Sequence, residues 1–284
     1  MDNMDFKVNA NDKSTKKYLL EIEKYMKSNV LNNNKFICCH KSECKKSYSG
    51  DFFEGQSYHI GKYYDLKINK KPFRVMVVGQ ELGHRERKLT LKDRYIEMGS
   101  PEEENWTFNG RNGDKGRNPH MKGTTSVLRL LFGKNLGVDY ESEFLDMTNK
   151  KKCHIFDAFA FVNYLLCSAL KEGKGMAGKS TRTMKNNCFE HFSNTVRILK
   201  PNVIIVQGKV IWEWIKDSFD EIKHYPGSEI IYQAKVNNSS AIVAFFTHPS
   251  VRNEDNWGNN DHTKYLLETV KPTVKRIQKI IGII

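Results

Sequence analysis

Three polar side chains with the chemistry of an acid, an amide and an imidazole each follow a separate apolar run of the sequence. They are Glu81 after Phe73–Val78, Asn163 after His154–Val162, and His248 after Ala241–Thr247. A carboxylate can activate water and stabilise a cation, an amide can pair with the edge of a base, and an imidazole can donate to a departing anion. This inventory suits cleavage of a glycosidic bond, in which the sugar becomes cationic and the leaving group gains negative charge.

Each of these residues also has a structural explanation when it is considered alone. An Asn after a strand is commonly a turn or cap residue, and Glu81 could cap a following helix. A single His is commonly a hydrogen-bonded surface or core residue. The placement of all three after separate strands favours the chemical interpretation.

The elements expected to position these residues alternate between strands and helices. Strand character appears in Phe73–Val78, His154–Val162, Asn202–Val206 and Ala241–Thr247. Helical spacing of apolar residues appears in Ser14–Val30, Thr124–Phe132, Met184–Leu199, Val210–Ile222 and Asp261–Ile281. The alternation predicts an α/β fold with a parallel sheet covered on both faces, and the ligand crevice of such a sheet lies beyond the carboxyl ends of its strands.

The chain has no internal repeat and no low-complexity linker, so we expect a single domain over residues 1–284. Within it we distinguish an N-terminal helical and cysteine-containing segment, 1–72, and a charged insertion, His84–Asn118, with a short helix around Leu91–Met98. A second polar loop, Lys171–Lys185, is basic and rich in Gly. Either loop could lie beside bound DNA or be a solvated surface loop.

The composition favours a polyanionic partner. The chain has 46 Lys and Arg against 33 Asp and Glu, a formal net charge of +13, which points to DNA unless a compositional bias merely solubilises the surface. No apolar stretch reaches the roughly 20 residues that span a bilayer, and the N-terminus lacks a secretory pattern. We expect a soluble, cytoplasmic, monomeric protein without a membrane partner.

Two short motifs resemble those of the uracil-DNA glycosylase superfamily. Gly79-Gln80-Glu81-Leu82-Gly83 is similar to its first motif, and His248-Pro249-Ser250 matches its second. The resemblance implies a three-layer α/β/α sandwich around a central four-stranded parallel sheet. It also implies roles for four residues: Glu81 aids water and the oxocarbenium ion, Gln80 contacts the base, Asn163 reads the base edge, and His248 stabilises the leaving anion.

The segment Gly116–Gly123 resembles the part of the iron–sulfur branch that places an aromatic ring over the base, and His120 occupies that place here. Gly83 stands where the commonest uracil enzymes have a Tyr that closes the space around the fifth carbon of the pyrimidine. The resemblance therefore leaves two substrates open. One is uracil, as in DNA repair, and the other is a bulky modified pyrimidine such as glucosylated hydroxymethylcytosine in phage DNA, as in antiviral defence.

The spacing of the cysteines resembles the same branch, which holds a [4Fe–4S] cluster. The corresponding ligands are Cys39, Cys44, Cys167 and Cys188, and Cys38 is an alternative to Cys39. Four thiolates complete such a cluster. Zinc on the same thiolates, and buried thiols without a metal, are the alternatives. Hydrolysis of a glycosidic bond transfers no electrons, so a cluster here would not act as a redox catalyst. It would instead brace the DNA-binding loops.

The loop after the second motif corresponds to the segment that fills the space left by a flipped base. Val251 and Arg252 are the candidates for insertion, and Ser250 for a phosphate contact. No Lys follows from the motifs as a Schiff-base nucleophile, so we expect a monofunctional enzyme that leaves an abasic site. The alternatives are a non-catalytic reader of modified or single-stranded DNA and an unrelated nucleotide-processing α/β enzyme.

Overall fold

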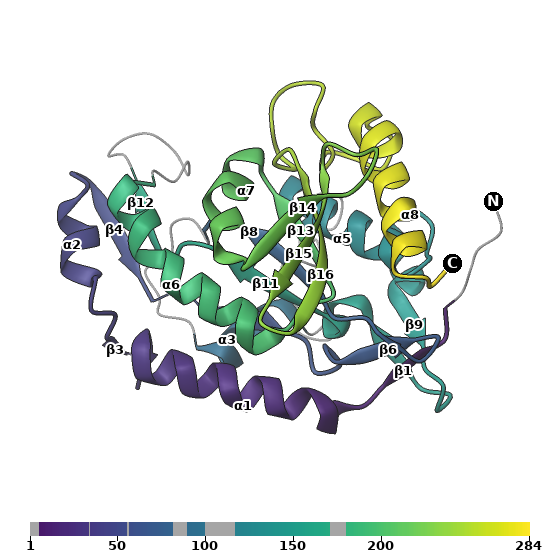
Figure 1. The fold of residues 1–284 in the computed structure, drawn as a ribbon, viewed down its shortest axis with the longest axis horizontal. Helices are drawn as coiled ribbons and strands as arrows, with labels where there is room; N and C mark the ends of the chain where they lie inside the picture. Colours follow the sequence, from purple (N-terminus) through teal and green to yellow (C-terminus); the bar gives the residue numbers. More distant parts are fainter. Residues whose placement is uncertain (1–5, 34, 56, 82–89, 100–116, 171–179) are drawn as a thin grey trace.

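The computed structural model describes residues 6–33, 35–55, 57–81, 90–99, 117–170 and 180–284 (Figure 1). Its centre is a mixed sheet of seven strands in the order β14-β15-β16-β13-β8-β11-β5. The strands are β5 (His59–Ile60), β8 (Val75–Gly79), β11 (Phe159–Asn163), β13 (Val203–Gln207), β14 (Glu221–His224), β15 (Ile231–Val236) and β16 (Ser239–Phe246). The predicted α/β class is confirmed.

The sheet is wider than the four strands that the sequence predicts. Strands β16, β13, β8 and β11 run parallel to one another, but antiparallel strands extend both edges, β15 and β14 on one side and β5 on the other. The run Val210–Ile222 was predicted as one helix. Instead α7 (Lys209–Ile215) ends in a 3-10 turn at Lys216–Ser218, and Glu221 begins strand β14. Short, polar edge strands carry little periodic signal.

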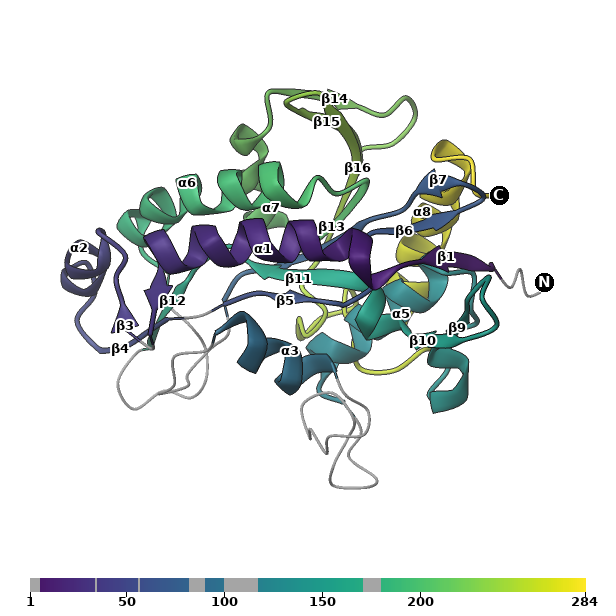
Figure 2. The same cartoon turned by 90° about the horizontal axis from the view of Figure 1, so that it is seen from below.

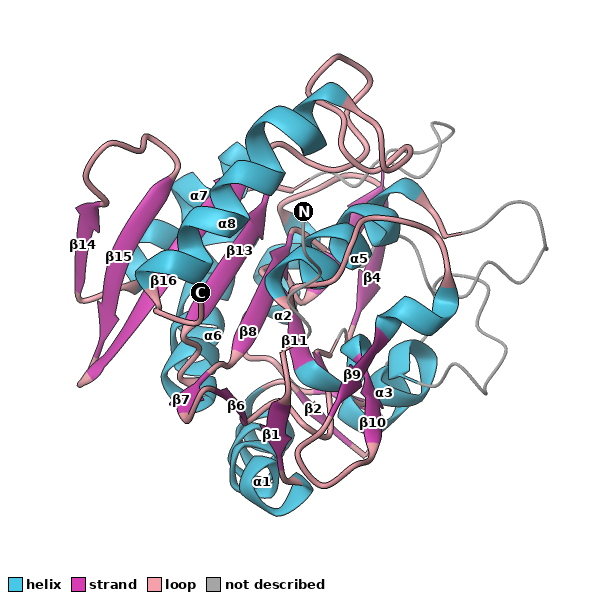
Figure 3. Cartoon of the chain, turned by 90° about the vertical axis from the view of Figure 1, so that its right-hand side faces the viewer, coloured by secondary structure: helices cyan, strands magenta, loops and turns pink. Residues whose placement is uncertain are grey.

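Helices pack on both faces of this sheet, because neighbouring residues of a strand point to opposite sides. Val75 and Val77 of β8 belong to one core and Met76 and Val78 to another. The first core includes residues of α5 (Pro119–Leu131) and α8 (Lys271–Ile280), and the second includes residues of α1 (Asp12–Asn29), α6 (Arg182–Leu199) and α7. Figure 3 shows α5 and α8 beside the parallel strands.

The remaining elements lie around this centre. Figure 2 shows α1 running along β11 and β5, with α3 beside β5. These elements are β1 (Val8–Ala10), β2 (Leu31–Asn32), β3 (Lys35–Phe36), α2 (Lys41–Lys46), β4 (Asp51–Glu54), β6 (Leu66–Ile68), β7 (Lys71–Pro72), α3 (Leu91–Gly99), β9 (Phe144–Asp146), β10 (Lys152–His154) and β12 (Cys167–Leu170). Helix α3 confirms the short helix expected inside the insertion, whose residues 84–89 and 100–116 lie outside the described part of the chain.

Two predicted elements begin with an irregular turn. The run His154–Val162 was predicted as one strand, but the His154 Nδ1 atom accepts from the Phe156 N–H and starts a 3-10 turn at Ile155–Ala158 before β11 begins. The last helix begins as a π-helical turn, Leu266–Val270, directly before α8. Pro272 lies in the first turn of α8, where its missing N–H is tolerated.

A buried ionic network joins α5 to the β9–β10 hairpin. The Glu143 carboxylate accepts from the Arg117 guanidinium at 2.5 and 2.6 Å, from Arg129 at 3.1 Å, and lies 2.9 Å from the His154 Nε2 atom. Burial alone would raise the pKa of Glu143, but the hydrogen bonds from His154 and Arg117 lower it to about 2. The network is expected to stabilise the fold above the ordinary pKa of a glutamate and to lose that contribution as the pH falls toward 2.

Glu143→Gln is therefore expected to destabilise the protein by about 3–5 kcal/mol, because it leaves the fully buried Arg129 without one of its carboxylate partners. Urea unfolding at pH 7 measures the change. The matched control is Glu221→Gln, which removes a surface carboxylate that pairs with Lys223 and Lys235, and it should destabilise the protein far less because solvent screens these pairs. Equal destabilisation by both variants would contradict the role of the buried network.

Candidate functional site

The parallel register brings the first motif beside Asn163. Asn163, the last residue of β11, pairs with Gly79, the last residue of β8. A Cβ atom on Gly79 would lie 2.8 Å from the Asn163 Oδ1 atom and 3.1 Å from the Phe161 ring. Only a glycine at this position leaves room for both side chains, and the Asn163 side chain is held at the strand ends with 3% exposure.

The two chain segments stay together beyond the strands. The Tyr164 N–H donates to the Gly79 carbonyl at 2.9 Å, and the Leu165 N–H donates to the Gln80 carbonyl at 2.8 Å. These bonds fix the backbone that carries Gln80 and Glu81. The Gln80 Nε2 atom lies 3.5 Å from one Glu81 carboxylate oxygen. The backbone segments that carry Gln80, Glu81 and Asn163 thus lie side by side at the ends of β8 and β11.

The environment of Glu81 suits a carboxyl group that titrates near neutrality. Burial raises the pKa of Glu81 to about 7, although hydrogen bonds from Ser168 and Gln80 oppose this effect. Among the described residues, nothing bonds the buried Oε2 atom. A buried acceptor without a partner is costly, so this atom is a natural position for a bound water or substrate group.

The titration of Glu81 predicts the pH dependence of any reaction in which its carboxylate activates water. Because only the ionised form can act as the base, the rate should rise with pH up to about 7 and level off above it. Single-turnover rates between pH 5 and 9 measure this profile. A rate that stays constant between pH 5 and 8 would contradict the assignment of Glu81 as the base.

His248 follows β16 and has a defined tautomer. Its Nδ1 atom lies 3.3 Å from the Ser250 backbone N and 2.9 Å from the Ser250 hydroxyl. Because the backbone N–H can only donate, Nδ1 is the acceptor and the proton of a neutral ring resides on Nε2. Burial lowers the pKa of His248, so the ring is neutral at pH 7 and can donate through Nε2.

His120 lies between His248 and β11. Its ring stacks on His248 with a centroid distance of 5.2 Å and an interplanar angle of 19°, and it meets Phe161 edge to face at 5.4 Å. Burial lowers the pKa of His120 to about 3, so the two stacked imidazoles are both neutral. Since Phe161 also borders Gly79, the contacts run continuously from the Asn163 side chain to His248.

The loop after β16 is fixed against the start of α5. The buried Trp257 indole donates to the Thr247 carbonyl at 2.7 Å, and the Gly258 N–H donates to the Pro249 carbonyl at 2.9 Å. A Cβ atom on Gly123 would lie 2.7 Å from the Pro249 ring. The second motif and the N-terminal turn of α5, which carries His120, therefore pack as one unit.

The other predicted contacts to DNA lie at the surface of this loop. Ser250 and Arg252 are exposed, and Val251 is half-buried with its carbonyl accepting from the Asn256 amide at 2.7 Å. Because Ser250 and Arg252 are exposed, their side chains are accessible to a phosphate. Gly83, expected beside the base, lies outside the described residues.

Two polar residues at the same strand ends were not anticipated. Gln207 ends β13 and is fully buried, and Ser168 in β12 hydrogen-bonds Glu81. Gln207 directly follows the run predicted as a strand over Asn202–Val206, so the rule applied to the other three strand ends would have identified it. Ser168 carried no comparable signal, because its partner comes from a distant part of the sequence.

Five of the six thiols lie close enough for their charges to influence one another. Cys38, Cys44, Cys167 and Cys188 form the buried part of this group, and of these thiols Cys39 acts on Cys38 and Cys44 only. Burial raises the pKa of Cys167 well above its usual range and that of Cys188 to about 12, and the neighbouring thiols add to both effects. Cys39 is exposed, so the structure favours Cys38 over Cys39 as the fourth member. Cys153 is buried in the other core.

The donor chemistry of this thiol group fits a metal cluster, although the group is not a preformed metal site. Within the described ranges, no three His, Cys, Asp or Glu side chains converge as metal ligands. Burial of four thiols without a cation keeps them protonated, and a bound metal would reverse this by stabilising the thiolates. The Cys38 Sγ atom also lies 3.4 Å from the His191 Nε2 atom, a contact typical of residues around a metal ligand.

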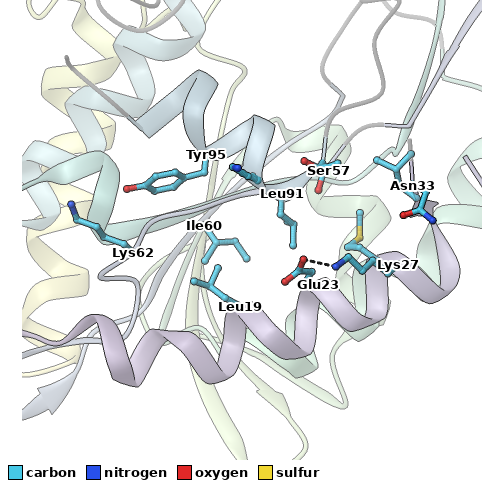
Figure 4. A pocket seen from close by; sticks show the side chains of 13 residues that line it. Leu19, Glu23, Lys27, Asn33, Ser57, Ile60, Lys62, Leu91 and Tyr95 are labelled. Atoms are coloured by element: carbon cyan, nitrogen blue, oxygen red, sulfur yellow. Dashed lines mark ion pairs between the residues drawn. The ribbon is translucent and has the colours of Figure 1, made fainter. Parts of the chain in front are cut away.

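A separate cavity of about 740 Å³ lies between α1, β5 and the start of α3 (Figure 4). Its lining is mainly apolar, and the Glu23 and Lys27 side chains form an ion pair across one side. Glu81, Asn163 and His248 do not line it. Size alone does not identify a site, and the polar groups with unsatisfied hydrogen bonding at the strand ends point to the chemistry more directly.

Comparison with known proteins adds no family assignment. No protein-family model matches the chain, and a search of curated proteins finds no match. No helix in the described ranges is long and apolar enough to cross a membrane.

Proposed function

We propose that the chain is a monofunctional DNA glycosylase that everts a base and hydrolyses its N-glycosidic bond, leaving an abasic site. The observation that carries the proposal is that Glu81, Asn163 and His248 follow three parallel strands of one sheet, β8, β11 and β16. Contacts of Phe161 and His120 connect the Asn163 side chain to His248. The proposal includes a three-layer α/β/α sandwich of the uracil-DNA glycosylase type.

The side chains supply the steps that hydrolysis requires. The Glu81 carboxylate faces the developing sugar cation and takes a proton from water, whose oxygen bonds to the anomeric carbon of the sugar. The Asn163 amide pairs with the edge of the everted base. The base leaves with the electron pair of the glycosidic bond. The His248 Nε2–H then donates a hydrogen bond to this anion, and its orientation is fixed by the bond that Nδ1 accepts from Ser250.

DNA is the proposed partner. The net charge of +13 favours binding of a polyanion, and the exposed Ser250 and Arg252 place a hydroxyl and a cation beside the second motif. Eversion of a base requires a few kcal/mol, which contacts to the phosphates and insertion from this loop would offset. Val251 and Arg252 are the residues proposed to fill the space left by the base.

The thiol group is proposed to hold a [4Fe–4S] cluster through Cys38, Cys44, Cys167 and Cys188. Such a cluster would brace α2, β12 and α6, the elements that carry three of these cysteines. Because β12 also carries Ser168, the brace would help to hold the partner of Glu81. Zinc on the same thiolates remains the alternative metal.

Mass analysis of the bases released from DNA tests the proposal. Duplexes that contain uracil or a modified pyrimidine are incubated with the protein in the presence of a chelator, and alkali then reveals abasic sites. We expect a free base and an alkali-labile site, without strand cleavage before alkali treatment. Tight DNA binding with no base released from any substrate would favour the alternative, a non-catalytic reader of modified DNA.

A further inference from the structure

Gln207 occupies a position at the strand ends that mirrors Asn163. The register of β13 against β8 ends with the pair Val206 and Val78, so Gln207 lies level with Gly79. Asn163 lies level with the same glycine from the other side. Two amide residues therefore flank a position without a side chain. Since neighbouring strands are about 4.8 Å apart, the backbones of Asn163 and Gln207 are separated by about 10 Å.

Both residues point toward the same face of the sheet. The Gln207 Nε2 atom lies 2.9 Å from the Thr124 hydroxyl of α5, and the Asn163 Oδ1 atom borders the Gly79 position next to Phe161. Phe161 in turn contacts His120 at the start of α5. Gln207 thus belongs to the corner of the fold where α5 meets the strand ends.

The hydrogen bonds of Thr124 determine which way the Gln207 amide is oriented. The Thr124 hydroxyl donates to the His120 carbonyl at 3.1 Å, as is usual for a Thr inside a helix. Its oxygen is then left as an acceptor, so the Gln207 group facing it must be the NH2. The Gln207 carbonyl oxygen, Oε1, faces the other way.

This Oε1 atom is buried, and no described residue bonds it. Gln207 is 0% exposed, so solvent does not reach the side chain. His120, whose carbonyl accepts from Thr124, also has a buried Nδ1 atom with no partner among the described residues. Unpaired buried polar atoms at a candidate site are expected where a ligand completes the hydrogen bonding.

We propose that Gln207 is a specificity-determining residue whose Oε1 atom accepts a hydrogen bond from a hydroxyl or N–H substituent of the everted base. This inference rests on the proposed glycosylase function and narrows its substrate class. Asn163 would pair with one side of the base, and Gln207 would meet a donor on the opposite side. A base without such a donor would leave Oε1 unpaired, so the preferred substrate is a pyrimidine that carries a polar substituent.

Two matched substrates and two variants test this inference. The substrates are duplexes that contain either 5-hydroxymethylcytosine or 5-methylcytosine, which differ by one hydroxyl, with a uracil duplex as the reference. The first variant, Gln207→Leu, removes the Oε1 acceptor. The second, Thr124→Val, removes the hydroxyl that the Gln207 NH2 group bonds but keeps the Gln207 Oε1 atom. Urea unfolding confirms that each variant is folded.

We expect the wild-type protein to release hydroxymethylcytosine at least about tenfold faster than methylcytosine, and Gln207→Leu to bring the hydroxymethylcytosine rate down to that on methylcytosine. Thr124→Val frees the Gln207 amide to rotate, so it should weaken the preference for the hydroxyl, but less than Gln207→Leu does. Equal rates of the wild-type protein on both cytosine substrates, or an equal loss by Gln207→Leu on every substrate, would overturn the inference alone. No base release from any of the three duplexes by the wild-type protein would count against the proposed function instead.

Discussion

Glu81→Gln is expected to lower the rate of base release by about 10²- to 10⁴-fold, because it removes the carboxylate that we propose activates water and faces the sugar cation. The change is nearly isosteric, so the packing around the side chain should survive. It also relieves the cost of burying a carboxylate whose pKa is raised to about 7. We therefore expect unfolding stability and DNA affinity to stay at or above their wild-type values.

His248→Ala should reduce the rate by a similar factor, about 10²- to 10³-fold, because it removes the donor to the leaving anion. It also removes one ring of the stacked pair with His120. Single-turnover rates and DNA affinity at fixed salt separate the two effects. The matched control is Glu21→Gln, which makes the same chemical change as the first variant on an exposed position of α1. Wild-type rates in both site variants would refute the assigned roles.

Removal of one thiol from the buried group is expected to have a large effect on metal content and on thermal stability. Cys38→Ser should abolish nearly all metal binding and lower the midpoint of thermal unfolding, because the proposed cluster would lose one of its four ligands and would no longer brace α2 against α6. The adjacent residue, Cys39, supplies the control. Cys39→Ser changes an exposed thiol one residue away and should leave both quantities unchanged.

Metal analysis and colour measure this result. Brown protein with iron and sulfide supports the cluster, and colourless protein with one bound zinc supports the alternative metal. Wild-type protein without either metal would show that the thiols are only buried core residues. Loss of metal in Cys39→Ser, but not in Cys38→Ser, would contradict the choice that the burial of the two side chains favours.

The sequence predicted the parts of the fold that periodicity controls. The four parallel strands and helices α1, α5 and α6 lie where the apolar spacing places them, within a few residues. It did not predict β14 or the 3-10 turn at Ile155–Ala158. The first depends on pairing with a neighbouring strand, and the second depends on a side-chain bond from His154. Neither leaves a periodic pattern in the chain.

The candidate site was predictable to the extent that it follows strand ends. Glu81, Asn163 and His248 were identified by that rule, and Gln207 was overlooked although the same rule applies to it. The stacking of His120 on His248 depends on how α5 packs against the loop after β16, which only the three-dimensional structure shows. The same is true of the choice between Cys38 and Cys39, which are adjacent in the sequence and differ only in burial.

The most direct test of the central claim is a structure of the protein bound to a duplex that carries a non-hydrolysable 2′-fluoro nucleotide of a substrate base. We expect the base to be everted, with its edge within hydrogen-bonding distance of the Asn163 amide and His248 Nε2 beside the carbonyl oxygen that becomes negative. A nucleotide that stays stacked in the duplex, or that binds away from Glu81, Asn163 and His248, would contradict the account.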